Sequence, residues 1–387
     1  MATLIKMEID KLVRKKSFWI GLCVVLVFVV ESYLRWVNPL GDGFYTLDKD
    51  GAMLHGRAAI RQEMEIAKQY HGILTDDVVE RILQNERWNE AQTTGLINNL
   101  SSVRSVFIQP YDVNRLLGNF FLIVDTMQGG YDSMMYEYGE ERLLPIGDVF
   151  PESAMPLYYE YSVPWGGTLE SIISSLFLLN IFLIVGISPL FSEEHTQKMN
   201  QLLFTSGFGR RKCFWAKTAA AYILGITLAL GVILLLMLAT FLFFGTGGLG
   251  CSIQLVEPFL YRDYPFVKTI GAVIVDAALI SIAGIFVTVS LTALVSALAK
   301  NVLNTVILSC VLFIAPVILR IFPTADWIRQ TAPINRMMDF AEVFCMPDAQ
   351  IGNGVVPCRY VIAGILVLIS AALTLCAALI YQKKSAE

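Results

Sequence analysis

The chain has 387 residues, of which 55% are hydrophobic and only 16% are charged, with a formal net charge of −4. Soluble domains carry about 25% charged residues, so this composition excludes an ordinary soluble protein and indicates an integral membrane protein. Three histidines and seven cysteines without a CxxC pair argue against a structural zinc site. The sequence also lacks a GxxxxGK[ST] motif, which excludes a P-loop nucleotide site in this chain.

The first 16 residues predict an amphipathic helix that lies on the membrane surface like an elbow before the first span. Ile5, Ile9 and Leu12 fall on one helical face, and basic and acidic residues cover the other. A merely charged start that flanks the first span is the alternative. In either case Lys15 and Lys16 place the N-terminus in the cytoplasm by the positive-inside rule.

Six apolar stretches are long enough to cross a membrane, since a spanning helix needs about 20 largely apolar residues. They are residues 17–37, 167–191, 218–245, 269–299, 302–321 and 359–381. An even number of spans returns residues 382–387 to the cytoplasm, and Lys383 and Lys384 agree with that side. The sequence therefore predicts an all-α, multi-pass protein of the cell membrane.

Residues 38–166, between the first two spans, predict a mainly helical extracellular domain. Residues 50–71 and 75–93 are expected to be helical, with Thr75 as an N-cap. The end of this domain is rich in tyrosine and acids, which indicates either an aromatic belt at the outer interface or a surface for a cationic, amphipathic ligand. The residues concerned are Tyr131, Tyr136, Tyr138, Glu140, Glu141, Tyr158, Tyr159, Glu160 and Tyr161, with Trp165 as the anchor of the belt.

Two further outer segments connect spans. Residues 246–268 form a loop, and residues 322–358 contain four prolines, which forbid one continuous helix and favour a re-entrant or helical hairpin. A disulfide between Cys345 and Cys358 is sterically conceivable but is left undetermined by the sequence.

The most informative polar stretch is residues 192–217. Glu193 and Glu194 stand where a helix would begin, and Met199, Leu202 and Leu203 form one apolar stripe on a short helix. Glycines then break the helix before a basic cluster, which consists of Arg210, Arg211, Lys212 and Lys217. An amphipathic helix of this kind at a membrane surface favours docking to a soluble partner, although the basic residues could simply anchor the segment to lipid.

Polar groups inside the spans are candidates for a substrate path, because charge at bilayer depth is costly. Asp276 could line a path for a cationic substrate, or it could pair with Arg320 or Arg359. Asn180 and Glu170 complete this set, with Glu170 also readable as an interfacial residue. No catalytic constellation and no metal-binding cluster is predicted, and an intramembrane enzyme would need a partner carboxylate or histidine beside Asp276.

The order of these elements resembles the membrane subunit of type-2 ABC exporters, the ABC-2 permeases. The likeness covers nearly the whole chain and is most specific after the second span, where the family shows an acid, a Gly-Thr-like step, Leu-Leu, a turn, Gly-Arg and a Lys. The matching positions are Glu193 and Glu194, Lys198–Met199, Leu202–Leu203, Ser206–Gly207, Gly209–Arg210–Arg211 and Lys217. Lys198 stands where the family usually has glycine.

This resemblance implies that residues 192–217 form a coupling helix in a groove of a separate, dimeric cytoplasmic ABC ATPase. ATP and Mg would be bound by that partner, and no cofactor by this chain. A second permease subunit, identical or homologous, and membrane lipids are the other implied partners, with no nucleic acid. Glu193 and Glu194 would contact the ATPase or cap the helix, Met199, Leu202 and Leu203 would supply apolar contact, and Arg210 and Arg211 would pair with acids or lipid phosphate.

The implied function is export of an amphipathic substrate, such as a peptide antibiotic or a drug-like molecule, from a bacterial cell. The extended outer domain is similar to that of Gram-positive permeases of antibiotic immunity or drug efflux. The alternative is a non-transporting ABC sensor or mechanotransmission subunit that detects an extracellular ligand with its outer domain.

Overall fold

The computed structural model describes residues 1–37, 45–47, 53–78, 81, 108–109, 142–143, 146–196, 209–256, 264, 266–299, 301–319, 349–351 and 354–383. The chain divides into two compact units. The first comprises Met1–Ser32, Glu170–Leu238 and Val275–Glu387, and the second comprises Tyr33–Leu169 and Ala239–Ile274.

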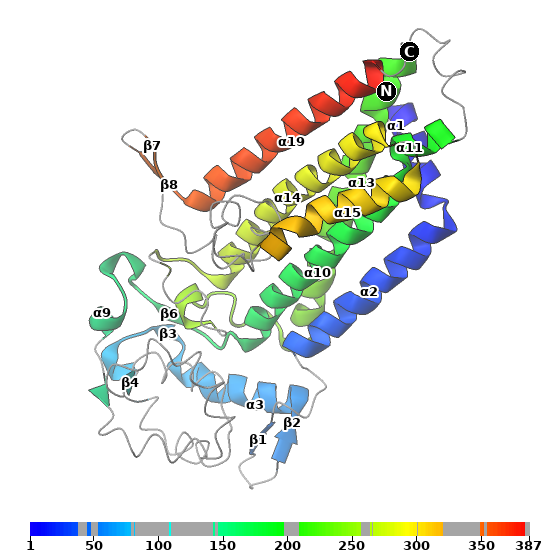
Figure 1. Ribbon diagram of the computed structural model, residues 1–387. Coiled ribbons are helices and arrows are strands. Elements are labelled where there is room, and N and C mark those ends of the chain that lie inside the picture. Colours follow the sequence, from blue (N-terminus) through cyan, green and yellow to red (C-terminus); the bar gives the residue numbers. More distant parts are fainter. Residues whose placement is uncertain are drawn as a thin grey trace. The chain divides into compact units, whose positions relative to one another are not determined.

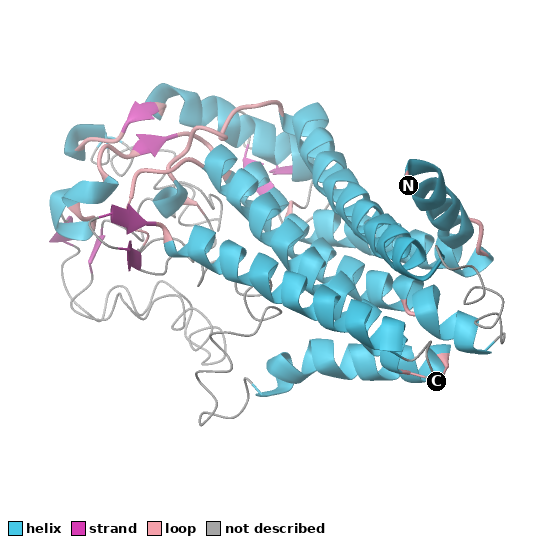
Figure 2. Cartoon of the chain, turned by 90° about the horizontal axis from the view of Figure 1, so that it is seen from above, coloured by secondary structure: helices cyan, strands magenta, loops and turns pink. Residues whose placement is uncertain are grey.

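Long apolar helices dominate the described part of the chain, as Figures 1 and 2 show. The helices longer than one turn are α1 (Ala2–Val13), α2 (Lys16–Trp36), α3 (Gly56–Ala67), α9 (Ile146–Val149), α10 (Val163–Ile187), α11 (Pro189–Thr196), α13 (Gly209–Phe244), α14 (Ile270–Leu298), α15 (Val302–Leu319) and α19 (Cys358–Lys383). Five stretches, around α2, α10, α13, α14 and α19, are long and apolar enough to cross a membrane. The protein is therefore a helical, multi-pass membrane protein. The apolar helix α15 has 18 residues, and its role as a sixth span stays a prediction.

Helices α10 and α14 run parallel to each other in the first unit. Thr288 Oγ1 donates a hydrogen bond to Asn180 Oδ1 at 2.7 Å, and Ser296 Oγ donates to Ser188 O at 2.8 Å. In each pair the two residues are 108 positions apart in the sequence. The same residues of α10 and α14 therefore stay side by side, with a constant offset, over two helical turns.

Helices α14 and α19 are also parallel. The bonds from Tyr360 to Asp276 and from Ser370 to the Phe286 carbonyl each join residues that are 84 positions apart. Helices α10, α14 and α19 therefore all run in the same direction. This agrees with the predicted topology, in which one span leads back across the membrane between each of these helices and the next.

Helix α15 begins at Val302, shortly after α14 ends at Leu298. Asn301 caps α15, because its Oδ1 accepts a hydrogen bond from Asn304 N at 2.8 Å. Phe313 of α15 packs on α10 beside Ile184, and its ring stacks on that of Phe177 with centroids 5.9 Å apart. Apolar packing thus holds α15 against α10.

The second unit contains short strands as well as α3. The hairpin of β1 (Tyr45–Leu47) and β2 (Met53–His55) precedes α3 and is antiparallel. The other antiparallel pairs in this unit are β3 (Gly72–Ile73) with β6 (Tyr158–Tyr159) and β4 (Ile108–Gln109) with β5 (Arg142–Leu143). The prediction of a continuous helix over residues 50–71 was therefore wrong at its start, where β2 lies.

The structure also tests two expectations for the segments that connect the predicted spans. Thr75 acts as an N-cap as predicted, since its Oγ1 accepts a hydrogen bond from Val78 N at 3.4 Å. In the first unit, β7 (Ala349–Ile351) and β8 (Gly354–Val356) form an antiparallel hairpin where a helical hairpin was predicted. Most of residues 322–358, Cys345 among them, and the side chain of Cys358 lie outside the described residues.

The described tyrosines do not form an aromatic belt. Tyr159, Tyr161 and Trp165 are 1%, 2% and 2% exposed, so they belong to the core of the second unit. Leu157 is also buried whereas Tyr158 is exposed, which is the alternation of a strand that covers a core with one face. The pairing of β6 with β3, which is distant in the sequence, fixes the orientation of Tyr159, and neither sequence interpretation anticipated it. Tyr131, Tyr136, Tyr138, Glu140 and Glu141 lie outside the described residues.

Candidate functional site

The start of the predicted coupling segment is a short helix held by its neighbours. Helix α11 follows α10 after Ser188, and Ser296 of α14 lies beside this break. Ser296 Oγ accepts hydrogen bonds from Phe191 N and Ser192 N, both at 3.1 Å, and donates to Ser188 O at 2.8 Å. The first N–H groups of a helix have no partner within it, so a side chain of α14 supplies the cap of α11.

Lys217 lies inside the protein rather than in an exposed basic cluster. Helix α13 already begins at Gly209, so Lys217 stands more than two turns into a helix and faces inward. It is fully buried, its Nζ donates to Leu190 O at 2.9 Å, and the ammonium lies 5.5 Å from the centroid of the Phe191 ring. Arg211, by contrast, is exposed. The grouping of Lys217 with the surface basic residues was therefore wrong.

Three aromatic rings join α11 to α13 and α19. The rings of Phe191 and Phe214 stack with centroids 5.2 Å apart and an interplanar angle of 12°. Tyr381, near the end of α19, lies 5.0 Å from the Phe191 ring and 5.8 Å from the Phe214 ring. Because Phe191 and Phe214 are completely buried, this contact is a packed core rather than a surface.

Glu193 joins α11 to the N-terminal part of the chain. Lys15 Nζ, between α1 and α2, lies 2.6 Å from Glu193 Oε2, with about 30% of each side chain exposed. We call the residues that fix α11 (Lys15, Phe191, Glu193, Lys217, Ser296 and Tyr381) the α11 junction. The contacts place the start of α2, the start of α13, the end of α14 and the end of α19 around one short helix.

Most of the remaining predicted coupling residues lie outside the part of the chain that the structure describes. Met199, Leu202 and Leu203 lie outside the described residues, as do the side chains of Glu194 and Arg210. Their roles in docking stay predictions.

Asp276 forms a buried ion pair. Its Oδ2 lies 2.7 Å from Arg359 Nε, and its Oδ1 accepts a hydrogen bond from Tyr360 OH at 3.1 Å. Asp276 and Arg359 are 3% and 6% exposed. The predicted pairing with Arg359 is present, because the parallel register of α14 and α19 brings the two side chains together. Arg320 lies outside the described residues, and a role of Asp276 in a substrate path stays a prediction.

Of the other two predicted path residues, Asn180 lies away from Asp276, whereas Glu170 lies near its level. The amide of Asn180 is hydrogen-bonded at both ends. Its Nδ2 donates to Leu176 O on α10 at 2.8 Å, and its Oδ1 accepts from Thr288 Oγ1 on α14. Thr288 stands 12 residues beyond Asp276, which is about 18 Å along α14. Glu170 is half-buried on α10. The 108-residue offset of α10 and α14 places it at nearly the same level as Asp276.

A hydroxyl cluster at the meeting of α13, α14 and α19 was missed by the sequence interpretation. Tyr222 OH lies 2.6 Å from Ser290 Oγ and 2.7 Å from Thr374 Oγ1, and Ser290 Oγ lies 2.7 Å from Ser370 Oγ. Ser370 and Thr374 are four positions apart on α19 and therefore share one helical face. That spacing was the available signal, but it does not reveal which helix the face meets.

In the second unit, backbone N–H groups of a tight loop surround a carboxylate. Glu160 Oε2 accepts hydrogen bonds from Gly248 N at 2.7 Å and Gly250 N at 3.2 Å. Burial raises the pKa of the adjacent Cys251 thiol to about 11, so the thiol is protonated at neutral pH. Burial also lowers the pKa of His71, against the opposing influence of Glu160. Within the described ranges, no group of three potential metal ligands occurs.

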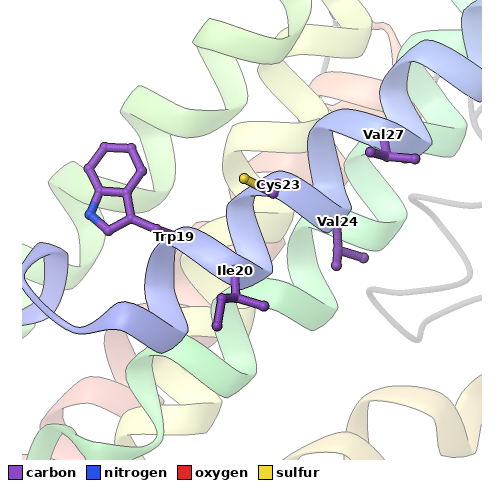
Figure 3. A pocket seen from close by; sticks show the side chains of 5 residues that line it. All are labelled: Trp19, Ile20, Cys23, Val24 and Val27. Carbon is purple, nitrogen blue, oxygen red and sulfur yellow. The ribbon is translucent and has the colours of Figure 1, made fainter.

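The apolar face of α2 bears a shallow hollow of about 480 Å³, lined by Trp19, Ile20, Cys23, Val24 and Val27 (Figure 3). All five residues come from one helix, and Ile20 and Val27 are 67% and 69% exposed. Exposed apolar side chains of a spanning helix are what lipid covers, so this hollow is not a binding site for a polar substrate.

Scans against protein-family models, curated proteins and solved structures found no match for this chain. The functional interpretation therefore depends on the residues and contacts described above.

Proposed function

We propose that this chain is the permease subunit of an ABC exporter and that α11, with the segment after it, receives the movement of a separate ATPase subunit. The observation that carries the proposal is the α11 junction. A helix of eight residues is too short to be stable by itself, so its position is set by the contacts it makes. A displacement of α11 is passed to every helix that those contacts reach.

Two of these contacts are especially suited to transmit force. Ser296 binds both sides of the break between α10 and α11, and Lys217 ties the α11 backbone to α13. Buried hydrogen bonds of this kind have few alternative partners, so the helices move together rather than slide. ATP and Mg would be held by a cytoplasmic ATPase dimer, with a second permease subunit, identical or homologous, completing the assembly.

The polar contacts inside the helical unit favour an amphipathic cargo over an inorganic cation. The carboxylate of Asp276 is neutralised by Arg359, and Asn180 is engaged with Leu176 and Thr288. These groups therefore offer no net negative charge to a cation. The proposal is export of a peptide antibiotic or drug-like molecule across a bacterial cell membrane, with both termini in the cytoplasm.

A non-transporting sensor is the second candidate, and one observation favours it. The second unit combines residues 33–169 with Ala239–Ile274, which include one end of α13 and the start of α14. A ligand bound by that unit has a covalent route into the two helices, so transmission without transport is mechanically feasible.

The test is purification of the tagged full-length chain in mild detergent, followed by identification of co-purifying proteins and by reconstitution. An ATPase that co-purifies, and substrate export that depends on ATP, would support the exporter. An ATPase without export, but with ligand-dependent ATP hydrolysis, would select the sensor. Activity of the isolated chain without any ATPase would refute both.

Charge variants test the coupling role of Glu193. We expect Glu193→Lys to reduce ATP-dependent export by about tenfold, in the range of a typical coupling free energy, while the exposed Glu65→Lys control leaves export unchanged. The double change Lys15→Glu with Glu193→Lys restores the internal ion pair with reversed polarity. Recovery of export would show that Glu193 acts through Lys15, and continued loss would show that it meets the partner. Unchanged export in Glu193→Lys would remove this residue from the coupling role.

A further inference from the structure

Two spanning helices end beside each other in the second unit. Helix α2 ends at Trp36 and α13 ends at Phe244, and the rings of Tyr33 and Phe243 lie 6.5 Å apart. Apolar spans end where the lipid headgroups begin. Trp36 is 42% exposed, and tryptophan is enriched at that depth. Phe243 therefore marks the membrane–water interface.

Helix α3 brings two arginines to this level. Arg57 Nε donates a hydrogen bond to Phe243 O at 3.2 Å, and Arg61 Nη2 donates to the same oxygen at 3.4 Å. The two residues are one helical turn apart and so share a face of α3. The Arg57 guanidinium also lies 5.1 Å from the centroid of the Phe243 ring.

The charge at this position exceeds what the end of α13 requires. Gly245, at a φ of 79°, already closes the helix by donating from its N–H to Phe241 O at 2.8 Å. A guanidinium has five N–H donors, so one donor from each arginine leaves most of them for another acceptor. Within the part of the chain that the structure describes, no carboxylate pairs with Arg57 or Arg61, and Glu65 on the same helix pairs with Lys68.

We propose that Arg57 and Arg61 bind the phosphate of an anionic phospholipid headgroup in the leaflet where α2 and α13 end. The planar guanidinium matches the geometry of phosphate oxygens, and two positive charges one turn apart select a lipid with net negative charge. Phe243 O holds both side chains in place before the lipid arrives, which lowers the entropy cost of binding. The site anchors α3 to the membrane surface and is independent of any ATPase partner.

The experiment compares bound lipids on the full-length protein in detergent by native mass spectrometry. The probes are phosphatidylglycerol, which is anionic, and phosphatidylcholine, whose phosphate is neutralised by its own ammonium group. We expect the unmodified protein to retain phosphatidylglycerol with about a tenfold preference, the strength of one or two charge-assisted bonds at an exposed site. Arg57→Gln with Arg61→Gln should abolish the preference, because glutamine still has an N–H for Phe243 O but carries no charge.

Lys68→Gln is the matched control, since it removes one exposed positive charge beyond the end of α3. It should keep the preference. Equal preference in the double variant and the unmodified protein would overturn the proposal, and so would an equal loss in Lys68→Gln. Displacement of the lipid by inorganic phosphate would overturn the lipid assignment in favour of a free-anion site.

If the double variant does not fold, as judged by its circular dichroism and unfolding midpoint, Arg61→Gln alone decides. Arg61 is exposed and makes the longer of the two bonds, so its replacement leaves Arg57 to hold the end of α13. We expect the lipid preference of this variant to fall about threefold. An undiminished preference in Arg61→Gln would count against the site.

Discussion

Removing the charge of Asp276 alone should destabilise the protein more than removing it together with the charge of Arg359. At 2.7 Å between Oδ2 and Nε, the Coulomb attraction is roughly 6 kcal/mol at an effective dielectric constant of about 20. Desolvation of two buried charges offsets most of this attraction, so the net contribution of the pair is small. Loss of one partner is different, because the other charge stays buried without compensation, at a cost of about 3–5 kcal/mol.

The assay is a double-mutant cycle in detergent, with unfolding followed by circular dichroism. We expect Asp276→Asn and Arg359→Gln each to lower the free energy of unfolding by about 3–5 kcal/mol, and the double variant to lose less than either single variant. Tyr360→Phe is the control for the neighbouring hydrogen bond and should cost only about 1 kcal/mol. Additive single effects would refute the buried pair.

The same variants separate a structural role of Asp276 from a role in transport. If the pair is structural, the double variant regains export together with stability. If Asp276 lines a path for a cationic substrate, export of that substrate stays low in the double variant although the protein is folded.

Three further predictions concern the second unit. Gly248→Ala should lower the free energy of unfolding by at least about 2 kcal/mol, because a Cβ at Gly248 would lie 2.2 Å from Tyr161 O and the residue has a φ of 99°; a thermal scan within error of the parent would contradict this. Cys251 should resist a maleimide reagent at neutral pH until the protein is unfolded, since its pKa is about 11 and it is fully buried; labelling of the native protein would be the opposite result. The pKa of His71 is lowered on folding, so the unfolded chain binds more protons, and stability should be constant above about pH 6.5 and fall as the pH drops below it. His71→Gln should remove that part of the pH dependence, and an identical pH profile in the variant would reject the assignment.

The apolar helices could be predicted from the sequence because the bilayer imposes a strong local rule. A helix that crosses lipid must be apolar over its whole length, and this requirement needs no knowledge of its neighbours. Residues 269–299 were predicted as a span, and α14 covers Ile270–Leu298. Capping is similarly local, which is why Thr75 was identified as an N-cap.

Contacts between helices were decided only by tertiary structure. The sequence could not tell which residue Asp276 meets, and the parallel register of α14 and α19 places Arg359 beside it. The sequence grouped Lys217 with a basic surface, but in the structure its Nζ donates a hydrogen bond to the Leu190 carbonyl. Periodicity tells which residues share a face of a helix, whereas the element that covers the face depends on packing between segments far apart in the chain. For that reason the membrane class of this protein follows from its sequence, and the partners of its buried charges follow only from its fold.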